Sequence, residues 1–198
     1  MKKEVIRSVM AGVFIGLGGA AFALCPDPYV GAFVFAMGLY LVCAFGMNLF
    51  TGRVGYFIDD PTPSNAYNLA SMWAGNFVGA AIVAIIVRFA RPDIIPITSA
   101  LVDGRLAQSG IQTFCHAVLC GALVYCSVAD YRQGKKPLAI MLCIPIFVAC
   151  KYEHCIADMF YMATAMRLGT VSIFHILLVT LGNTAGAFAT HIAIRATS

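Results

Sequence analysis

The sequence predicts an all-α membrane protein of six transmembrane helices, built as an inverted 3+3 repeat with a broken second and a broken fifth helix. The prediction rests on composition, on six apolar runs and on an internal repeat. Of the 198 residues, 61% are hydrophobic and 11% are charged, whereas a soluble domain carries about 45–50% apolar and about 25% charged residues. Too few charged residues remain to cover a water-facing surface, so lipid is the expected solvent.

Six runs are long and apolar enough to cross a bilayer, which takes about 20 residues per helix. They lie at residues 6–25, 29–51, 66–90, 108–129, 137–163 and 170–194. Proline, glycine and charged residues separate them, and these residue types stop a helix or begin the next one. The first run resembles a signal peptide but lacks a small-x-small cleavage site, so we treat it as a membrane helix. Residues 1–198 therefore form a single membrane domain.

Basic residues orient the predicted helices. The loops and helix ends on one side carry eight of them, and the opposite side carries four: Lys2, Lys3, Arg7, Arg53, Arg132, Lys135, Lys136 and Arg195 against Arg88, Arg91, Arg105 and Arg167. The richer side is expected to be cytoplasmic. Both termini are then cytoplasmic, in a multi-pass protein of the cell (inner or plasma) membrane. This pattern also explains the net charge of +4 without a nucleic-acid partner.

A short motif occurs twice. Gly75-Asn76-Phe77-Val78-Gly79-Ala80 in the third run matches Gly182-Asn183-Thr184-Ala185-Gly186-Ala187 in the sixth, at an offset of 107 residues (183 minus 76). Three runs separate the copies, and three is odd, so the halves at about 5–91 and 104–195 insert in opposite orientations. Inverted repeats place a pore or substrate site near the bilayer midplane, lined by interrupted helices.

The second and fifth runs contain the polar interruptions. Thr51 and Arg53 lie at the end of the second run, and the fifth contains Lys151-Tyr152-Glu153-His154 and Asp158. Charged groups inside a membrane helix are costly, and they usually face a bundle interior or a wet cavity. An alternative reading is a self-neutralising structural cluster, in which Lys151 or Arg105 balances the two carboxylates.

The sequence gives little support to disulfide bonding, metal binding or catalysis. The eight cysteines lie mostly inside apolar runs and form no CxxC pair, so they are expected to act as small buried hydrophobes. The remaining histidines, His116, His175 and His191, lie in different runs without zinc-site spacing. No phosphate loop or nucleophile motif is present. We therefore predict no metal, no cofactor and no enzymatic activity.

Four motifs in order resemble the formate/nitrite transporter family, whose members pass formate, nitrite, hydrosulfide or lactate. They are Gly31–Gly38 leading to Asn48-Leu49-Phe50-Thr51-Gly52, then Gly75-Asn76, Tyr152-Glu153-His154-Cys155-Ile156-Ala157-Asp158-Met159-Phe160, and Thr180-Leu181-Gly182-Asn183. The resemblance implies an aquaporin-like protomer with its own pore and assembly as a homopentamer. It also implies a channel or transporter for small monovalent anions of weak acids.

The resemblance further implies roles for individual residues. His154 is the central pore histidine, and Thr51 faces it. Lys151, three residues before His154, is a further candidate for the pore centre from this sequence itself. Phe50, Leu39 and Leu49 form the cytoplasmic constriction, and Phe35, Val124 and Phe147 form the opposite one. Arg105, Asp158, Glu153, Asn183 and Asn76 occupy vestibule and supporting positions. Because an ordinary histidine titrates near about 6.5, His154 can supply a proton or a positive charge to an anion between the two apolar gates.

Departures from the family pattern leave several points open. Lys151 stands where the family has glycine, and Asp158 stands where it has asparagine. Lys151 either faces the pore or pairs with Asp158. Gly121 stands where the formate channel has a pore asparagine, which predicts the loss of one donor. The family's amphipathic N-terminal segment is absent from this sequence, so we do not expect that segment to gate the pore.

Two other functions compete with anion transport. One is a neutral-solute pore of the water, urea or glycerol type, and the other is a membrane subunit of an enzyme complex. The second needs paired haem histidines, for which His116 with His175 is a weak candidate. The charges of Lys151, His154 and Arg105 favour anions. The sequence leaves open which anion passes and whether protons accompany it.

Overall fold

The computed structural model describes residues 2–197, which contain helices and no strand. The elements are α1 (Lys2–Leu24), α2 (Pro28–Ala44), α3 (Phe50–Arg53), the 3-10 helix η1 (Val54–Asp59), α4 (Pro63–Ala90), α5 (Ile94–Leu106), α6 (Gly110–Gly134), α7 (Leu138–Ala149), α8 (Cys155–Thr164) and α9 (Thr170–Ala196). Helices α1, α4, α6 and α9 are long and apolar enough to cross a membrane, and α2 and α7 are shorter apolar helices.

Local chemistry sets where several helices begin. Asp27 caps α2 by accepting hydrogen bonds from the backbone N–H groups of Tyr29 and Val30. Thr62 caps α4 by accepting from the backbone N–H of Asn65. In each case a proline follows the cap, where its missing N–H costs nothing. The Pro-rich stretches of the sequence are therefore helix starts, as their residue types predict.

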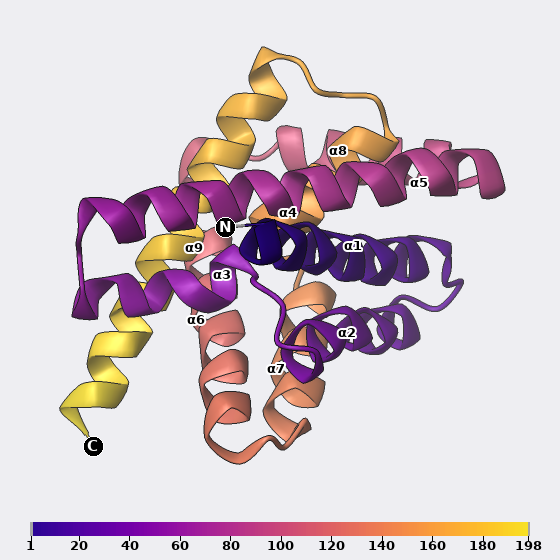
Figure 1. Cartoon of the computed structure of the whole chain (residues 1–198). Coiled ribbons are helices and arrows are strands. Elements are labelled where there is room, and N and C mark those ends of the chain that lie inside the picture. The colour runs from indigo at the N-terminus through magenta and orange to yellow at the C-terminus, as the bar shows by residue number, and fades with distance from the viewer. Residues whose placement is uncertain (1, 198) are drawn as a thin grey trace.

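Close contacts between long helices build the interior. Helix α1 (indigo) lies between α2 and α4, and α9 (yellow) packs against α6 (Figure 1). A Cβ atom on Gly79 of α4 would lie 1.9 Å from the carbonyl oxygen of Val9 in α1, and one on Gly186 of α9 would lie 2.0 Å from that of Val118 in α6. The repeated Gly-Asn motif therefore marks two places where backbones touch, as small residues allow in membrane bundles.

The second and fifth apolar runs are interrupted. Helix α2 ends at Ala44 and α3 begins at Phe50, while α7 ends at Ala149 and α8 begins at Cys155. Helices α2 and α7, the first helix of each pair, end in the same kind of turn. The backbone N–H of Met47 bonds to the carbonyl of Val42 at 2.8 Å, and that of Tyr152 bonds to the carbonyl of Phe147 at 2.9 Å. After the turn, the chain continues into α3 in the first case and into α8 in the second.

Helix α5 was not anticipated from the sequence. It has 13 residues, too few to cross a bilayer, and it precedes α6. Its buried side chains Ile94, Thr98 and Val102 recur every four residues, and the helix packs against α8. A search for runs of about 20 apolar residues passes over such an element. Its last turn carries Arg105 to the functional site.

Candidate functional site

The two helix breaks meet at His154 and Thr51. The Nε2 atom of His154 lies 2.9 Å from the hydroxyl oxygen of Thr51, and the two residues are 2% and 0% exposed. His154 also caps α8, because its Nδ1 accepts the backbone N–H of Ala157 at 3.2 Å. An accepting Nδ1 assigns the proton of the neutral ring to Nε2. Nε2 therefore donates to the Thr51 oxygen, and the hydroxyl proton of Thr51 stays available to a ligand.

Asn183 of α9 holds the break before α8 in place. Its Oδ1 accepts the backbone N–H of Cys155 at 3.0 Å. Its Nδ2 donates to the carbonyls of Ala117 and Glu153, both at 2.8 Å. One buried amide thus fixes the chain on both sides of His154 and ties it to α6.

Asn76 of α4 does the same for the break before α3. Its Oδ1 accepts the backbone N–H of Phe50 at 2.9 Å. Its Nδ2 donates to the carbonyls of Ser8 at 2.7 Å and Asn48 at 2.8 Å. The two copies of the Gly-Asn motif therefore make matching sets of three hydrogen bonds, each to one helix start, one loop carbonyl and one neighbouring long helix.

Apolar side chains enclose the His154–Thr51 pair. Phe147 stacks on the His154 ring with centroids 5.7 Å apart, and Phe35 meets Phe147 edge to face at 5.6 Å. Leu49 and Phe50, which precede Thr51 in the chain, are 2% and 7% exposed. The other two predicted constriction residues, Leu39 and Val124, are equally buried at 2% and 1%. All six predicted apolar residues thus lie in the interior.

A cavity of about 240 Å³ opens beside the aromatic pair, and we call it the Arg105 vestibule. Phe35, Phe147 and His154 are among its lining residues, and the charged side chains that line it are Arg105, Lys151 and Glu153. Two cations and one carboxylate leave its wall positive. The predicted pore residues His154 and Lys151 therefore line the same cavity as Arg105 and Glu153, two of the predicted vestibule and supporting residues.

A second cavity of about 150 Å³ touches Leu49, and we call it the Arg53 vestibule. Its charged lining residues are Arg53, Arg132 and Lys135, all cationic. Arg53 donates a hydrogen bond to the side-chain oxygen of Asn48 at 3.1 Å. The sequence analysis counted these cations only as markers of orientation. The structure brings them together at the opening next to the predicted Leu49–Phe50 constriction.

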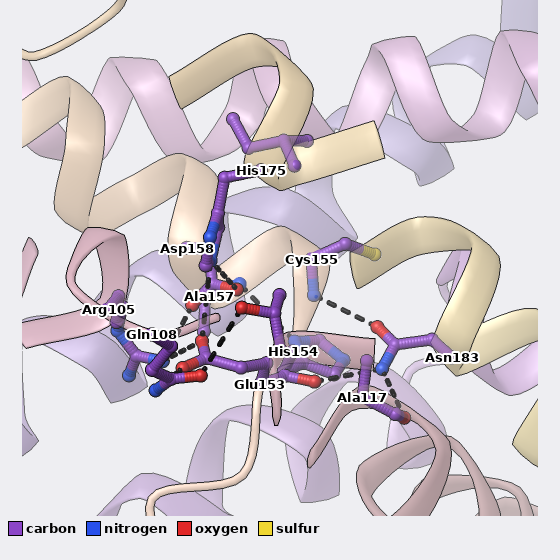
Figure 2. A network of polar contacts seen from close by, with 12 residues as sticks. Arg105, Gln108, Ala117, Glu153, His154, Cys155, Ala157, Asp158, His175 and Asn183 are labelled. Carbon is purple, nitrogen blue, oxygen red and sulfur yellow. Dashed lines mark hydrogen bonds and ion pairs between the residues drawn. The ribbon is translucent and has the colours of Figure 1, made fainter. Parts of the chain in front are cut away.

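A buried cluster of charged groups lies beside the Arg105 vestibule (Figure 2). Arg105 pairs with Glu153 and lies 3.1 Å from Oδ1 of Asp158. Gln108 also donates to Glu153, at 2.8 Å. His175 of α9 points into the same cluster, and its Nε2 lies 3.7 Å from Oε2 of Glu153. Arg105 is the basic partner of both carboxylates, so this part of the self-neutralising alternative holds alongside the vestibule role.

Lys151 lines the vestibule with an exposed side chain. The sequence left open whether Lys151 pairs with Asp158. In the structure the Arg105 guanidinium lies beside Asp158 instead, and Lys151 lines the vestibule. The backbone of Lys151 is left-handed, with φ of 56°, and Gly46 in the other break has φ of 64°. Glycine adopts this conformation without strain. A lysine here accepts backbone strain and places a charge at the vestibule.

The expectation for Gly121 is wrong. A Cβ atom at this position would lie 2.2 Å from the carbonyl oxygen of Asn183. Gly121 therefore lets α6 approach α9 at the amide that holds the His154 break. It packs against backbone rather than removing a donor from the pore, and an asparagine side chain has no room there.

Sequence reasoning missed Gln108 and His175 as members of the site. Gln108 lies just beyond α5, the helix that was not anticipated. His175 was weighed only for metal-site spacing within its own run, and its partners lie on another segment. A signal for it existed, because His175, Val179 and Asn183 recur every four residues and all face the interior. Because Asn183 was expected to lie in the interior, this spacing would have predicted that His175 faces the interior too.

A separate polar chain joins η1 to the end of α9. The Tyr125 hydroxyl lies 2.6 Å from Nδ1 of His191, and Nε2 of His191 lies 2.9 Å from Oδ1 of Asp59. Arg195 also pairs with Asp59. The hydrogen bond from His191, together with the Arg195 guanidinium, holds the pKa of the Asp59 carboxyl below its usual range. This chain fixes the segment that follows Thr51 to the bundle.

Comparison with known proteins agrees with this geometry. The nitrite transporter NirC of Escherichia coli (strain K12) is 30% identical over 90% of this chain and 77% of its own length. A solved structure titled "FNT family ion channel" superimposes with a TM-score of 0.88 at 25% identity, over 98% of this chain and 89% of that one. One titled "Pentameric formate channel with formate bound" shares the fold, with a TM-score of 0.83 at 20% identity over 99% and 96%. The family model described as "Formate/nitrite transporter" matches residues 1–196. The chain therefore belongs to the formate/nitrite transporter family and is a multi-pass membrane protein.

Proposed function

We propose that this protein carries small monovalent anions of weak acids, such as formate, nitrite or hydrosulfide, through a pore centred on His154. One observation carries the proposal. The 2.9 Å contact between His154 and Thr51 is buried between apolar layers and lies between two vestibules that are lined by cations. A pore for neutral solutes has no need of cations at both openings.

The vestibules concentrate the substrate. Arg105 and Lys151 line one opening, and Arg53, Arg132 and Lys135 line the other. A positive recess with low-dielectric walls raises the local concentration of small anions, and this effect weakens as salt increases. Because both openings are positive, the arrangement supports entry of anions from either side.

The apolar layers between the vestibules oppose a hydrated ion. Phe35 and Phe147 on one side and Leu49 and Phe50 on the other offer no hydrogen bond from their side chains, so an anion that crosses them gives up its water at a large cost. Desolvation also raises the affinity of a weak-acid anion for a proton. The anion therefore crosses together with a proton.

His154 and Thr51 receive the substrate between the layers. The Nε2–H group donates to the Thr51 oxygen, so the Thr51 hydroxyl proton is the donor left for the substrate at this point of the path. The bond from Ala157 to Nδ1 favours the neutral ring, because a proton on Nδ1 would remove that cap. His154 therefore acts as a neutral hydrogen-bond donor that orients Thr51, and Thr51 presents its hydroxyl proton to the substrate.

The same proposal includes the assembly. Six helices or helix pairs cross the cytoplasmic membrane, both termini are cytoplasmic, residues 1–198 form one domain, and the halves at about 5–91 and 104–195 are inverted repeats. The matching hydrogen bonds of Asn76 and Asn183 support the repeat. Large apolar side chains such as Phe89 and Phe174, 85% and 68% exposed, suit contact with lipid or with neighbouring protomers. The pentameric formate channel of the same fold supports a homopentamer.

Flux into proteoliposomes tests the function. Formate, nitrite, hydrosulfide, acetate and lactate are offered at several pH values, with water, urea and glycerol as neutral solutes. We expect flux of at least one of the anions, and the proposal is wrong if only neutral solutes cross. His154→Asn should greatly reduce anion flux and change its pH dependence. His116→Asn is the matched control, because His116 lines neither vestibule.

A further inference from the structure

The buried cluster beside the Arg105 vestibule carries unequal charges. Glu153 and Asp158 contribute two carboxyl groups with side chains 0% exposed, and Arg105, at 13%, contributes one positive charge. His175 is the fourth member, with its side chain 7% exposed. If His175 is neutral and both carboxyl groups are ionised, the cluster holds one uncompensated negative charge. A buried charge without a counter-charge costs several kcal/mol.

Hydrogen bonding shows where the excess charge lies. Glu153 accepts hydrogen bonds from Arg105 and Gln108. Neither side-chain oxygen of Asp158 has a hydrogen bond, and neither does Nε2 of His175. These two unsatisfied groups face each other, with Nε2 of His175 lying 4.0 Å from Oδ2 of Asp158 (Figure 2). A separation of 4.0 Å is too long for a hydrogen bond, so both groups are buried polar atoms without a hydrogen-bond partner, close enough to compete for one proton.

The surrounding elements supply no further positive charge to Asp158. The titratable groups in electrostatic range are Arg105 of α5, Glu153 in the break, Cys120 of α6, and Cys155 and Tyr161 of α8. His175 comes from α9. The thiols and the phenol are neutral or negative in every state. Within the part of the chain that the structure describes, Arg105 and a protonated His175 are thus the available cations.

We propose that Asp158 and His175 form a buried proton-binding site, which holds one proton at neutral pH and so balances the charge of the cluster. The proton belongs to the pair, because a neutral Asp158 carboxyl and a protonated His175 both give a net charge of zero. Glu153, Asp158 and His175 are also close enough together to surround a cation. The Arg105 guanidinium at 3.1 Å from Asp158 opposes a divalent ion there, whereas a single proton fits the missing charge.

The site lies behind the wall of the vestibule. Arg105 and Glu153 line the cavity, whereas Asp158 and His175 do not. Loss of the proton adds a negative charge behind that wall and lowers the local concentration of anions. This consequence rests on the proposed function. It makes the supply of anions to His154 larger at low pH than at high pH, through groups that lie off the path.

Protein stability tests the proton site without any transport. In the unfolded chain Asp and His titrate at about 3.9 and about 6.5, so both have released their protons above about pH 7. A proton that only the folded state holds makes the unfolding constant rise by up to tenfold per pH unit in this range. We expect that rise for the wild type in unfolding titrations with SDS micelles. Asp158→Asn removes the excess charge and should remove the extra tenfold dependence.

Matched variants separate this effect from general damage. Asp158→Asn combined with His175→Gln should show the same pH dependence as Asp158→Asn alone, and His116→Gln should keep the wild-type dependence. If Asp158→Asn keeps the full wild-type dependence, the proposal is overturned. Infrared spectra give a second measurement. At neutral pH the wild type should show a protonated carboxyl or imidazolium signal that Asp158→Asn lacks, and identical spectra of the two proteins would also overturn the proposal.

Flux measurements then test the consequence. Anion influx from the side of the Arg105 vestibule should fall more steeply with pH in the wild type than in Asp158→Asn. Absence of anion flux in the wild type would contradict the proposed function and leave the stability result standing. A difference in stability with identical flux profiles would confine the proton site to a structural role and overturn its effect on anion entry.

Discussion

Replacing Asn183 by alanine tests how the His154 break is held. The change removes three hydrogen bonds, to the Cys155 N–H and to the Glu153 and Ala117 carbonyls. The first two groups lie outside regular helix pairing and become buried without partners, at about 1–3 kcal/mol each. Ala117 lies inside α6 and contributes less. We therefore expect a loss of about 2–6 kcal/mol in the free energy of unfolding, together with loss of anion flux because His154 is no longer positioned.

Unfolding in SDS micelles measures this loss, and three variants control it. Asn76→Ala should cost a similar amount, because its amide makes the matching bonds. Asn183→Asp keeps the acceptor for Cys155 and turns a carboxylate towards two carbonyls, so it should be no better than alanine. Asn68→Ala, at an exposed position on α4, should change stability by less than about 0.5 kcal/mol. If Asn183→Ala is as mild as Asn68→Ala, the reasoning is refuted.

Three further predictions concern single positions. Lys151→Gly should raise the free energy of unfolding by about 1 kcal/mol, because glycine adopts the left-handed backbone without strain. The same change should reduce anion flux at low anion concentration and low salt. Unchanged flux would contradict the vestibule role. Gly121→Asn should abolish folded protein in size-exclusion chromatography, because it clashes with the backbone of Asn183. The lowered pKa of Asp59 contributes stability that is present above its ordinary pKa and lost as pH falls through the folded value. The protection of amides in residues 54–59, taken relative to intrinsic exchange at the same pH, should therefore fall in acid, and Asp59→Asn should abolish that fall.

Much of the site could be predicted because membrane burial makes polar residues conspicuous. His154, Glu153 and Asp158 stood out as ionisable groups within an apolar run, and all three are buried. The repeated Gly-Asn motif stood out because a buried amide next to a small residue has few uses other than bonding to backbone. Each of these signals is local in sequence. The fold class and the core of the site follow from such local signals.

The parts that could not be predicted depend on contacts between distant segments. The Asp158–His175 pair joins α8 to α9, and no spacing rule within one helix reveals it. Arg105 reaches Glu153 from α5, a helix too short for a search based on bilayer thickness. Gly121 was misassigned because an alignment position says nothing about which side of α6 faces Asn183. In each case three-dimensional packing, rather than residue type, decided the role.

The hydrogen bonds that hold the two helix breaks match, whereas the charges of their side chains differ. Gly46 and Asn48 of the first break, with Arg53 of α3, lie 105 positions before Lys151 and Glu153 of the second break and Asp158 of α8 (151 minus 46, 153 minus 48, 158 minus 53). The backbone bonds match, since Asn48 and Glu153 both offer their carbonyls to the amide of an asparagine. The side chains differ, because the first break presents an amide and a cation where the second presents two carboxyl groups. Changes to the asparagines should therefore alter the stability of either break alike, whereas changes to Lys151 or Asp158 should alter how one vestibule attracts anions.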